Sequence, residues 1–319
     1  MGTSGKIYAN AVAKYNEGKL LDAEKLRRIS DAEYSDAIKM LYDYGYGEGI
    51  AIETADAVRL TDGETAKLLQ FVSEYVDDEN LYGFLLGAYL YNNLKASVKS
   101  RFTTVEESAY YPVFMDECEK VKAGVYDGLS ANAQSALKKI DEIIEEGTIS
   151  SRRIDEILTK AQYADELKFE KKLGKNAFKY AVYKIDCANL TTAMRCKKMG
   201  VKTADATEMY VTGGKISLDT FVEILSAEED KLVSLVNEEY YDEIKELVTV
   251  GDLASFERNT DDRLFELIVR DRENMMTYDP LIGYFFAKKR EIEGIKLILV
   301  CIKNGVQSEI RRRLRNIGE

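Results

Sequence analysis

The chain has 319 residues, of which 45% are hydrophobic and 32% charged, with two prolines and a formal net charge of −11. The scarcity of proline favours long, uninterrupted helices and argues against an architecture of strands and turns, so we predict an all-α protein. The negative charge argues against nucleic acid as a partner, because binding to phosphates needs a basic face, and against adhesion to anionic lipid.

Cysteine usage and apolar runs indicate the cellular setting. The four cysteines do not have the spacing of metal ligands, and the chain has no histidine. We expect buried free thiols and therefore a reducing, cytoplasmic location. The most apolar stretch, residues 281–302, is interrupted by charged residues, so we expect no direct membrane insertion.

Apolar periodicity and capping signals predict helices along the whole chain. Ser30 to Glu33 fits a capping box that opens the third helix, and Thr61 to Glu64 is expected to open the fourth. The predicted helices cover residues 7–18, 19–28, 30–44, 60–76, 81–102, 130–146, 150–166, 171–198, 217–226, 228–248, 253–272, 281–302 and 307–316.

One helical pattern occurs three times, about a hundred residues apart. Each copy places its residues at spacings of 3, 4, 3 and 4, which is one stripe of a helix. The copies are Phe84, Gly87, Tyr91, Leu94 and Val98; Tyr180, Tyr183, Cys187, Leu190 and Met194; and Phe285, Lys288, Ile292, Ile295 and Leu299. Asp186 and Glu291 occupy the same slot of the second and third copies. We predict three helical lobes, with boundaries at 1–112, 113–212 and 213–319.

Catalytic motifs are weak in this sequence. The fragment Thr212 to Lys215 lacks the spacing of a phosphate-binding loop, and without histidine a cysteine or serine nucleophile lacks its usual base. Asp261 and Asp262 resemble the aspartate-rich helices of magnesium-dependent all-α enzymes, although their spacing fits a solvated helical face better. We predict no catalytic, cofactor-binding or metal-binding residue. A magnesium-dependent enzyme using these two aspartates, or a generic helical-repeat scaffold, remains the alternative.

Basic residues gather at two places and are candidates for contact with an acidic partner surface. The other interpretation is that they complement helix dipoles and add solubility. The candidates are Lys288, Lys289, Arg290, Arg311, Arg312, Arg313 and Arg315.

Several motifs, in the same order over nearly the whole chain, resemble one family: the C subunit of the V/A-type ATPases (ATP synthases), equivalent to the d subunit of the eukaryotic vacuolar enzyme. They begin with Tyr8 to Ala13 and Tyr183 to Leu190, followed by Met194 to Gly200 and Tyr210 to Lys215. The most specific is Asp279 to Ile292, continuing to Gly305. The first repeat departs from the pattern, because Leu90 stands where the other two copies have an acid.

The resemblance implies a funnel of three helical lobes in pseudo-threefold arrangement. In this family the funnel is a socket: its mouth takes the central shaft, a coiled coil, and its base sits on the membrane ring of proteolipid subunits. The resemblance thus implies a non-catalytic rotor subunit that transmits torque for ion transport coupled to ATP. It also implies peripheral attachment to the cytoplasmic face of the membrane.

Overall fold

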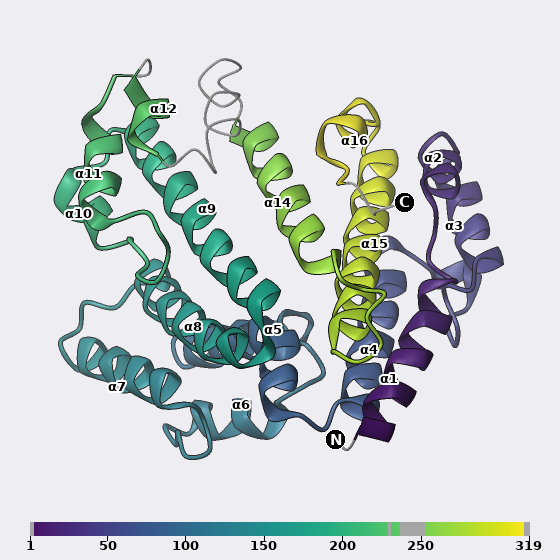
Figure 1. Cartoon of the computed structure of the whole chain (residues 1–319), viewed down its shortest axis with the longest axis horizontal. Coiled ribbons are helices and arrows are strands. Elements are labelled where there is room, and N and C mark those ends of the chain that lie inside the picture. The colour runs from purple at the N-terminus through teal and green to yellow at the C-terminus, as the bar shows by residue number, and fades with distance from the viewer. Residues whose placement is uncertain (1–2, 229–230, 237–252, 316–319) are drawn as a thin grey trace. The chain divides into compact units, whose positions relative to one another are not determined.

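The computed structural model describes residues 3–228, 231–236 and 253–315 (Figure 1). In these ranges all regular structure is helical, either α or 3-10, which confirms the all-α prediction. Most of the helix predicted at 228–248 lies outside the described residues. The chain forms two compact units, one from residues 1–77 and 239–319 and one from residues 78–238. These units divide the chain at other points than the three lobes, whose boundaries stay a prediction.

The first unit is built around α15 (Asp279–Lys303), which packs mainly against α1, α4 and α14 (Figure 1). Buried residues lie on most of its circumference, from Pro280 to Ile302, because neighbouring helices cover it on several sides. Pro280 stands in the first turn, where its missing N–H costs nothing. The other elements are α1 (Thr3–Glu17), α2 (Ala23–Ser30), α3 (Tyr34–Asp43), the 3-10 helix η1 (Ile52–Thr54), α4 (Ala57–Tyr75), α14 (Leu253–Val269) and α16 (Ser308–Arg313).

The core of this unit joins residues from opposite ends of the chain. Side chains of α2, α3 and α4 pack in one cluster with side chains from the second half of α15. Its fully or nearly fully buried members include Leu21, Leu26, Ile29, Leu41, Leu60, Ile295, Ile298 and Leu299. Each such side chain contributes about 1.5 to 3 kcal/mol by burial, so this cluster holds α15 against the N-terminal helices.

The second unit is organised around α8 (Ser151–Leu173), which packs against α5, α7 and α9. Ser130, Ser150 and Ser217 cap α7, α8 and α11 by accepting a backbone N–H three residues on, and the predicted starts of these helices lie at the same residues. The other elements are α5 (Glu79–Lys99), η2 (Glu107–Ala109), α6 (Met115–Lys122), α7 (Ala131–Glu145), α9 (Lys175–Met199), α10 (Thr203–Thr207), α11 (Leu218–Ser226) and α12 (Leu232–Leu235).

The three copies of the repeated pattern form α5, α9 and α15. Apart from the half-buried Met194 and Lys288, every residue of the three stripes is buried. In α5, the amide of Asn93 donates to the carbonyls of Tyr111 and Val113 and accepts the N–H of Tyr111. In α9, the equivalent Asn189 bonds both backbone groups of Val211. The first two copies of the repeat therefore share a buried asparagine that fixes the loop following the helix.

The two helix starts predicted from the signals at Ser30 and Thr61 are wrong. Ser30 does not open a helix: it is the last residue of α2, its hydroxyl donates to the carbonyl of Arg27, and α3 begins at Tyr34. Burial of Ile29 explains the extension of α2, since its apolar face continues to that residue. The fourth helix, α4, starts at Ala57 with Asp56 as its N-cap, four residues before the predicted signal.

Candidate functional site

Lys288 lies in a network of charged and polar side chains that joins α15 to α4. Its Nζ atom is 2.8 Å from Oε2 of Glu64 and 2.7 Å from Oε1 of Glu291, and it lies 4.5 Å from the ring centre of Tyr46. The hydroxyl of Tyr46 donates to Glu291 at 2.6 Å. The side chain of Lys288 is only 14% exposed. These contacts are internal to the first unit, so Lys288 holds this unit together.

Glu291 connects the network to the backbone. Its Oε2 atom accepts the N–H of Leu21, which lies between α1 and α2. Burial lowers the pKa of Lys288, but the carboxylates of Glu291 and Glu64 outweigh this effect and leave the pKa above its ordinary value. Burial, with Glu291 beside the hydroxyl, raises the pKa of Tyr46 well above its ordinary value. Lysine is thus charged and tyrosine neutral at physiological pH.

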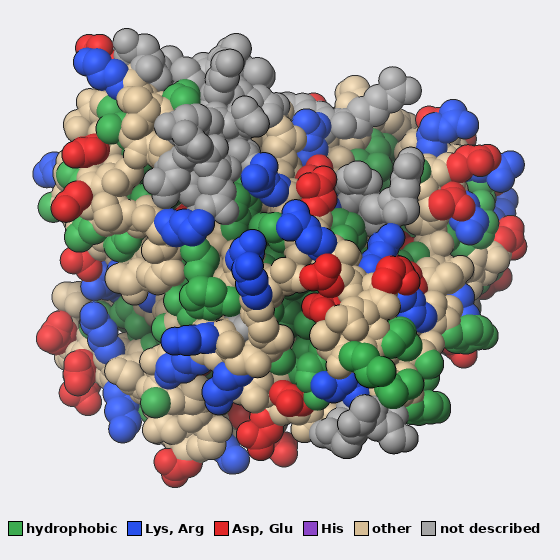
Figure 2. All heavy atoms as spheres, viewed as in Figure 1, with side chains coloured by type: hydrophobic (Ala, Val, Ile, Leu, Met, Phe, Trp, Pro, Cys, Tyr) green, Lys and Arg blue, Asp and Glu red, His purple; other side chains and the backbone are tan. Residues whose placement is uncertain are grey.

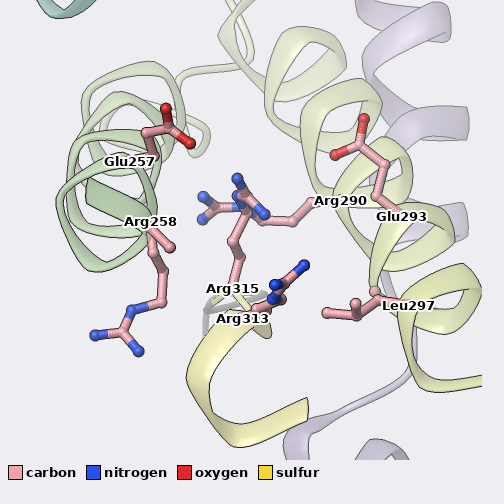
Figure 3. Close-up of a pocket in the computed structure, with 9 residues that line it drawn as sticks. Glu257, Arg258, Arg290, Glu293, Leu297, Arg313 and Arg315 are labelled. Carbon is pink, nitrogen blue, oxygen red and sulfur yellow. The ribbon is translucent and has the colours of Figure 1, made fainter. Parts of the chain in front are cut away.

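A second group of basic residues lines a pocket of about 420 Å³, which we call the arginine pocket (Figure 3). Its walls come from α14, from α15 and from the end of the described chain. The lining residues are Ala254, Glu257, Arg258, Arg290, Glu293, Gly294, Leu297, Arg313 and Arg315. Three of the predicted interface residues, Arg290, Arg313 and Arg315, thus lie at one place, although they are up to 25 positions apart in sequence.

Arg290 is a buried residue of this pocket and is 7% exposed. Its guanidinium is 2.9 Å from Oδ1 of Asp262 and lies 4.5 Å from the ring centre of Phe265, a cation–π contact. Burial lowers the pKa of Arg290, and the charge of Arg315 acts in the same direction, while Asp262 and Asp261 oppose both. An arginine stays protonated under these conditions, so a positive charge is held at the pocket wall.

The other two arginines also have acidic partners. Arg315 donates from both Nε and Nη2 to Oδ2 of Asp261, at 2.7 and 2.5 Å. Nε of Arg313 lies 3.1 Å from Glu309 in a pair on the surface of α16. Both aspartates considered for magnesium are therefore bound to guanidinium groups. Within the described ranges, no three His, Cys, Asp or Glu side chains gather as a metal site.

Of the remaining predicted residues, the structure describes the side chain of Lys289. Lys289 is 34% exposed, with Nζ 4.0 Å from Oε1 of Glu293. The side chains of Arg311 and Arg312 lie outside the described residues. The sequence did not predict that Arg258 lines the pocket or that Glu64 belongs to the network. Glu291 could be recognised in the sequence, because it is an acid in an apolar repeat and occupies the same slot as Asp186.

The exposed face in Figure 2 carries interspersed acidic and basic side chains. Hydrophobic side chains gather on it over α1, where Ile7, Tyr8 and Tyr15 are exposed (Figure 2). Across the described part of the chain, every helix is too short or too polar to cross a bilayer.

Comparisons with known proteins agree on one family. The family model described as ATP synthase (C/AC39) subunit matches residues 9–314. The chain is 23% identical to the A-type ATP synthase C subunit of Desulfurococcus sp. strain SY, covering 95% of this chain and 88% of that protein. The same protein of Halorubrum lacusprofundi is 22% identical, with 93% of each chain covered. That of Pyrococcus furiosus is 23% identical, with 95% of this chain and 88% of that protein covered.

The match extends over both compact units and contains the three repeat helices, the buried network and the residues of the arginine pocket other than Arg315. The family expected from the sequence motifs is confirmed. The chain belongs to the ATP synthase (C/AC39) subunit family.

Proposed function

We propose that this chain is a non-catalytic central-stalk subunit of a V/A-type ATP synthase or ATPase. In this role it is a socket that joins the central shaft to the membrane ring of proteolipid subunits and transmits torque between them. The observation that carries the proposal is the family match from residue 9 to residue 314, together with relatives that are covered almost end to end.

The internal construction of the first unit suits transmission of force. A torque-bearing subunit must resist shear, and here α15 is joined to the N-terminal helices by both an apolar cluster and a buried network. Breaking a buried ion pair costs about 3 to 5 kcal/mol, so such a unit resists sliding of one helix past another.

The net charge of the chain favours attachment to the membrane through other proteins rather than through lipid. With a net charge of −11, the chain is not drawn to anionic lipid, and it reaches the membrane by docking on proteins already there. We propose two partners: the coiled-coil subunits of the shaft and the proteolipid ring. Attachment to the cytoplasmic face of the membrane through the complex follows from these partners.

The contacts of the two adjacent aspartates favour this role over a magnesium-dependent enzyme. Asp261 pairs with Arg315 and Asp262 with Arg290, so a magnesium ion would have to displace two guanidinium groups. A scaffold for unrelated partners differs from the proposed role only in the identity of the partner, which experiment decides.

A binding assay tests the proposal. The purified chain is mixed with the shaft subunits of the same organism and, separately, with the detergent-solubilised proteolipid ring. We expect a stable complex with each, isolated by size-exclusion chromatography. If a well-folded chain bound neither partner, the proposed role would be wrong.

A further inference from the structure

The third repeat differs from the other two at the slot of the buried asparagine. Asn93 in α5 and Asn189 in α9 fix the loops that follow these helices. The same slot of α15, one residue before Ile295, holds Gly294. Gly294 lines the arginine pocket. A position that closes a loop onto its helix in two repeats therefore borders an open space in the third.

The pocket wall carries more positive than negative charge. Four arginines line it against two glutamates, Glu257 and Glu293. The carboxylates that pair with Arg290, Arg313 and Arg315 come from Asp262, Glu309 and Asp261, and none of these three residues lines the pocket. Glu293 itself lies 4.0 Å from Lys289. The three acids that form these ion pairs thus contact the arginines from outside the cavity, while the charge of Glu293 acts on Arg290 from the pocket wall.

Figure 3 shows how the side chains lie. The guanidinium groups of Arg290, Arg313 and Arg315 gather in the middle of the pocket, while Arg258 points away from them. The carboxylates of Glu257 and Glu293 lie on opposite sides of this group (Figure 3). Neighbouring like charges repel, as the lowering of the pKa of Arg290 by Arg315 indicates. An anion between these groups would relieve the repulsion and accept several charge-assisted hydrogen bonds.

We infer that the arginine pocket binds carboxylate side chains of an acidic segment of another subunit. The partner's identity rests on the proposed function; the ligand chemistry rests on the pocket. Carboxylates fit better than phosphate, because a single carboxylate group carries one negative charge and is repelled less by Glu257 and Glu293 than a phosphate dianion is. Leu297 supplies an apolar wall for the methylene groups of a glutamate. Guanidinium groups match the two oxygens of a carboxylate in a bidentate contact.

The experiment is a titration of the full chain, followed by calorimetry, with a synthetic peptide, acetyl-Glu-Glu-Leu-Glu-Glu-amide. The same peptide with glutamine in place of glutamate, and inorganic phosphate at equal ionic strength, are titrated in parallel. We expect saturable binding of the acidic peptide alone. Arg313→Gln should weaken this binding about tenfold, because it removes a charged donor from the pocket.

Arg152→Gln is the matched control. Like Arg313, Arg152 is mostly exposed and bonds through Nε to a glutamate four residues away on its helix, but it lies in the second unit. We expect Arg152→Gln to leave peptide binding unchanged. Three outcomes would each overturn the inference. They are an equal loss of peptide affinity in both variants, binding of phosphate but not of the peptide, and no binding of the peptide by a folded chain.

The two proposals fail separately. If Arg313→Gln and the original chain bound shaft and ring equally well and neither bound the peptide, the pocket inference would be wrong and the stalk role would stand. If the peptide bound through Arg313 but neither shaft nor ring did, the pocket would stand and the stalk role would be wrong.

Discussion

The carboxylate of Glu291 on α15 accepts a hydrogen bond from the backbone N–H of Leu21, which precedes it by 270 positions in the chain. The same carboxylate accepts the hydroxyl of Tyr46 and pairs with Lys288. One side chain thus joins the last long helix to two segments of the N-terminal region.

Glu291→Gln should destabilise the folded chain by about 3 kcal/mol, measured by urea unfolding. The amide places an N–H donor against the donor of Leu21 or Tyr46, and the charge opposite Lys288 is lost. Glu293→Gln, at an exposed position of the same helix, should change stability by less than about 0.5 kcal/mol. Equal effects of the two changes would contradict the role given to Glu291.

The loop after α5 depends on Asn93. Asn93→Ala should cost about 3 kcal/mol, because it leaves three backbone groups of residues 111–113 without their partner. The neighbouring Asn92 makes one exposed bond to the carbonyl of Ala109, so Asn92→Ala should cost less than about 1 kcal/mol. Thermal unfolding of both variants measures the difference in stability. A larger loss of stability for Asn92→Ala than for Asn93→Ala would refute the role given to Asn93.

Gly214 allows a close approach of the loop before α11 to α9. Asp186 accepts the N–H groups of Lys215 and Ile216, and a Cβ atom on residue 214 would clash with its carboxylate. Gly214→Ala should therefore destabilise the chain by about 2 kcal/mol. Gly63→Ala should stabilise it by about 1 kcal/mol, because this glycine lies inside α4 with ordinary contact distances around its Cβ position. Denaturant midpoints of the two variants should shift in opposite directions; a shift in the same direction would contradict this account.

Ionisation of Tyr126 should contribute to the loss of folding stability at alkaline pH. Burial, then the hydrogen bond to Asp141, raises the pKa of Tyr126 to about 12 from an ordinary value of 10.0. A raised pKa in the folded chain gives stability that is complete below pH 10 and lost as the pH rises to about 12. The free energy of unfolding, measured from pH 10 to pH 12, should fall less steeply with pH for the Tyr126→Phe variant than for the original chain. Tyr15→Phe, at an exposed tyrosine, should leave the slope unchanged.

The sequence predicts the repeat helices well, but it predicts the first residues of individual helices less well. The stripes of α5, α9 and α15 were recognisable because burial on one face imposes a helical period over five positions. The capping signal at Ser30 failed because Ile29, buried in the core, continues α2 past it. A capping residue is only one local preference, and the tertiary contact of a neighbouring residue overrides it.

The site was predictable only in part. Arg290, Arg313 and Arg315 were recognised as basic clusters, but their meeting in one pocket depends on how α14, α15 and α16 pack. The burial of Lys288 depends on Glu64, more than 200 positions away on α4. No local spacing indicates such a partner, whereas the acid at 291 was visible as a shared repeat slot with Asp186.

The most direct test of the central claim is coupling, measured in vesicles that contain the rotary complex rebuilt with and without this chain. ATP hydrolysis and ATP-driven ion transport are recorded together. If the chain is the socket between shaft and ring, the complex without it hydrolyses ATP but does not transport ions, and adding the chain restores transport. Ion transport at the full rate in its absence would contradict the account.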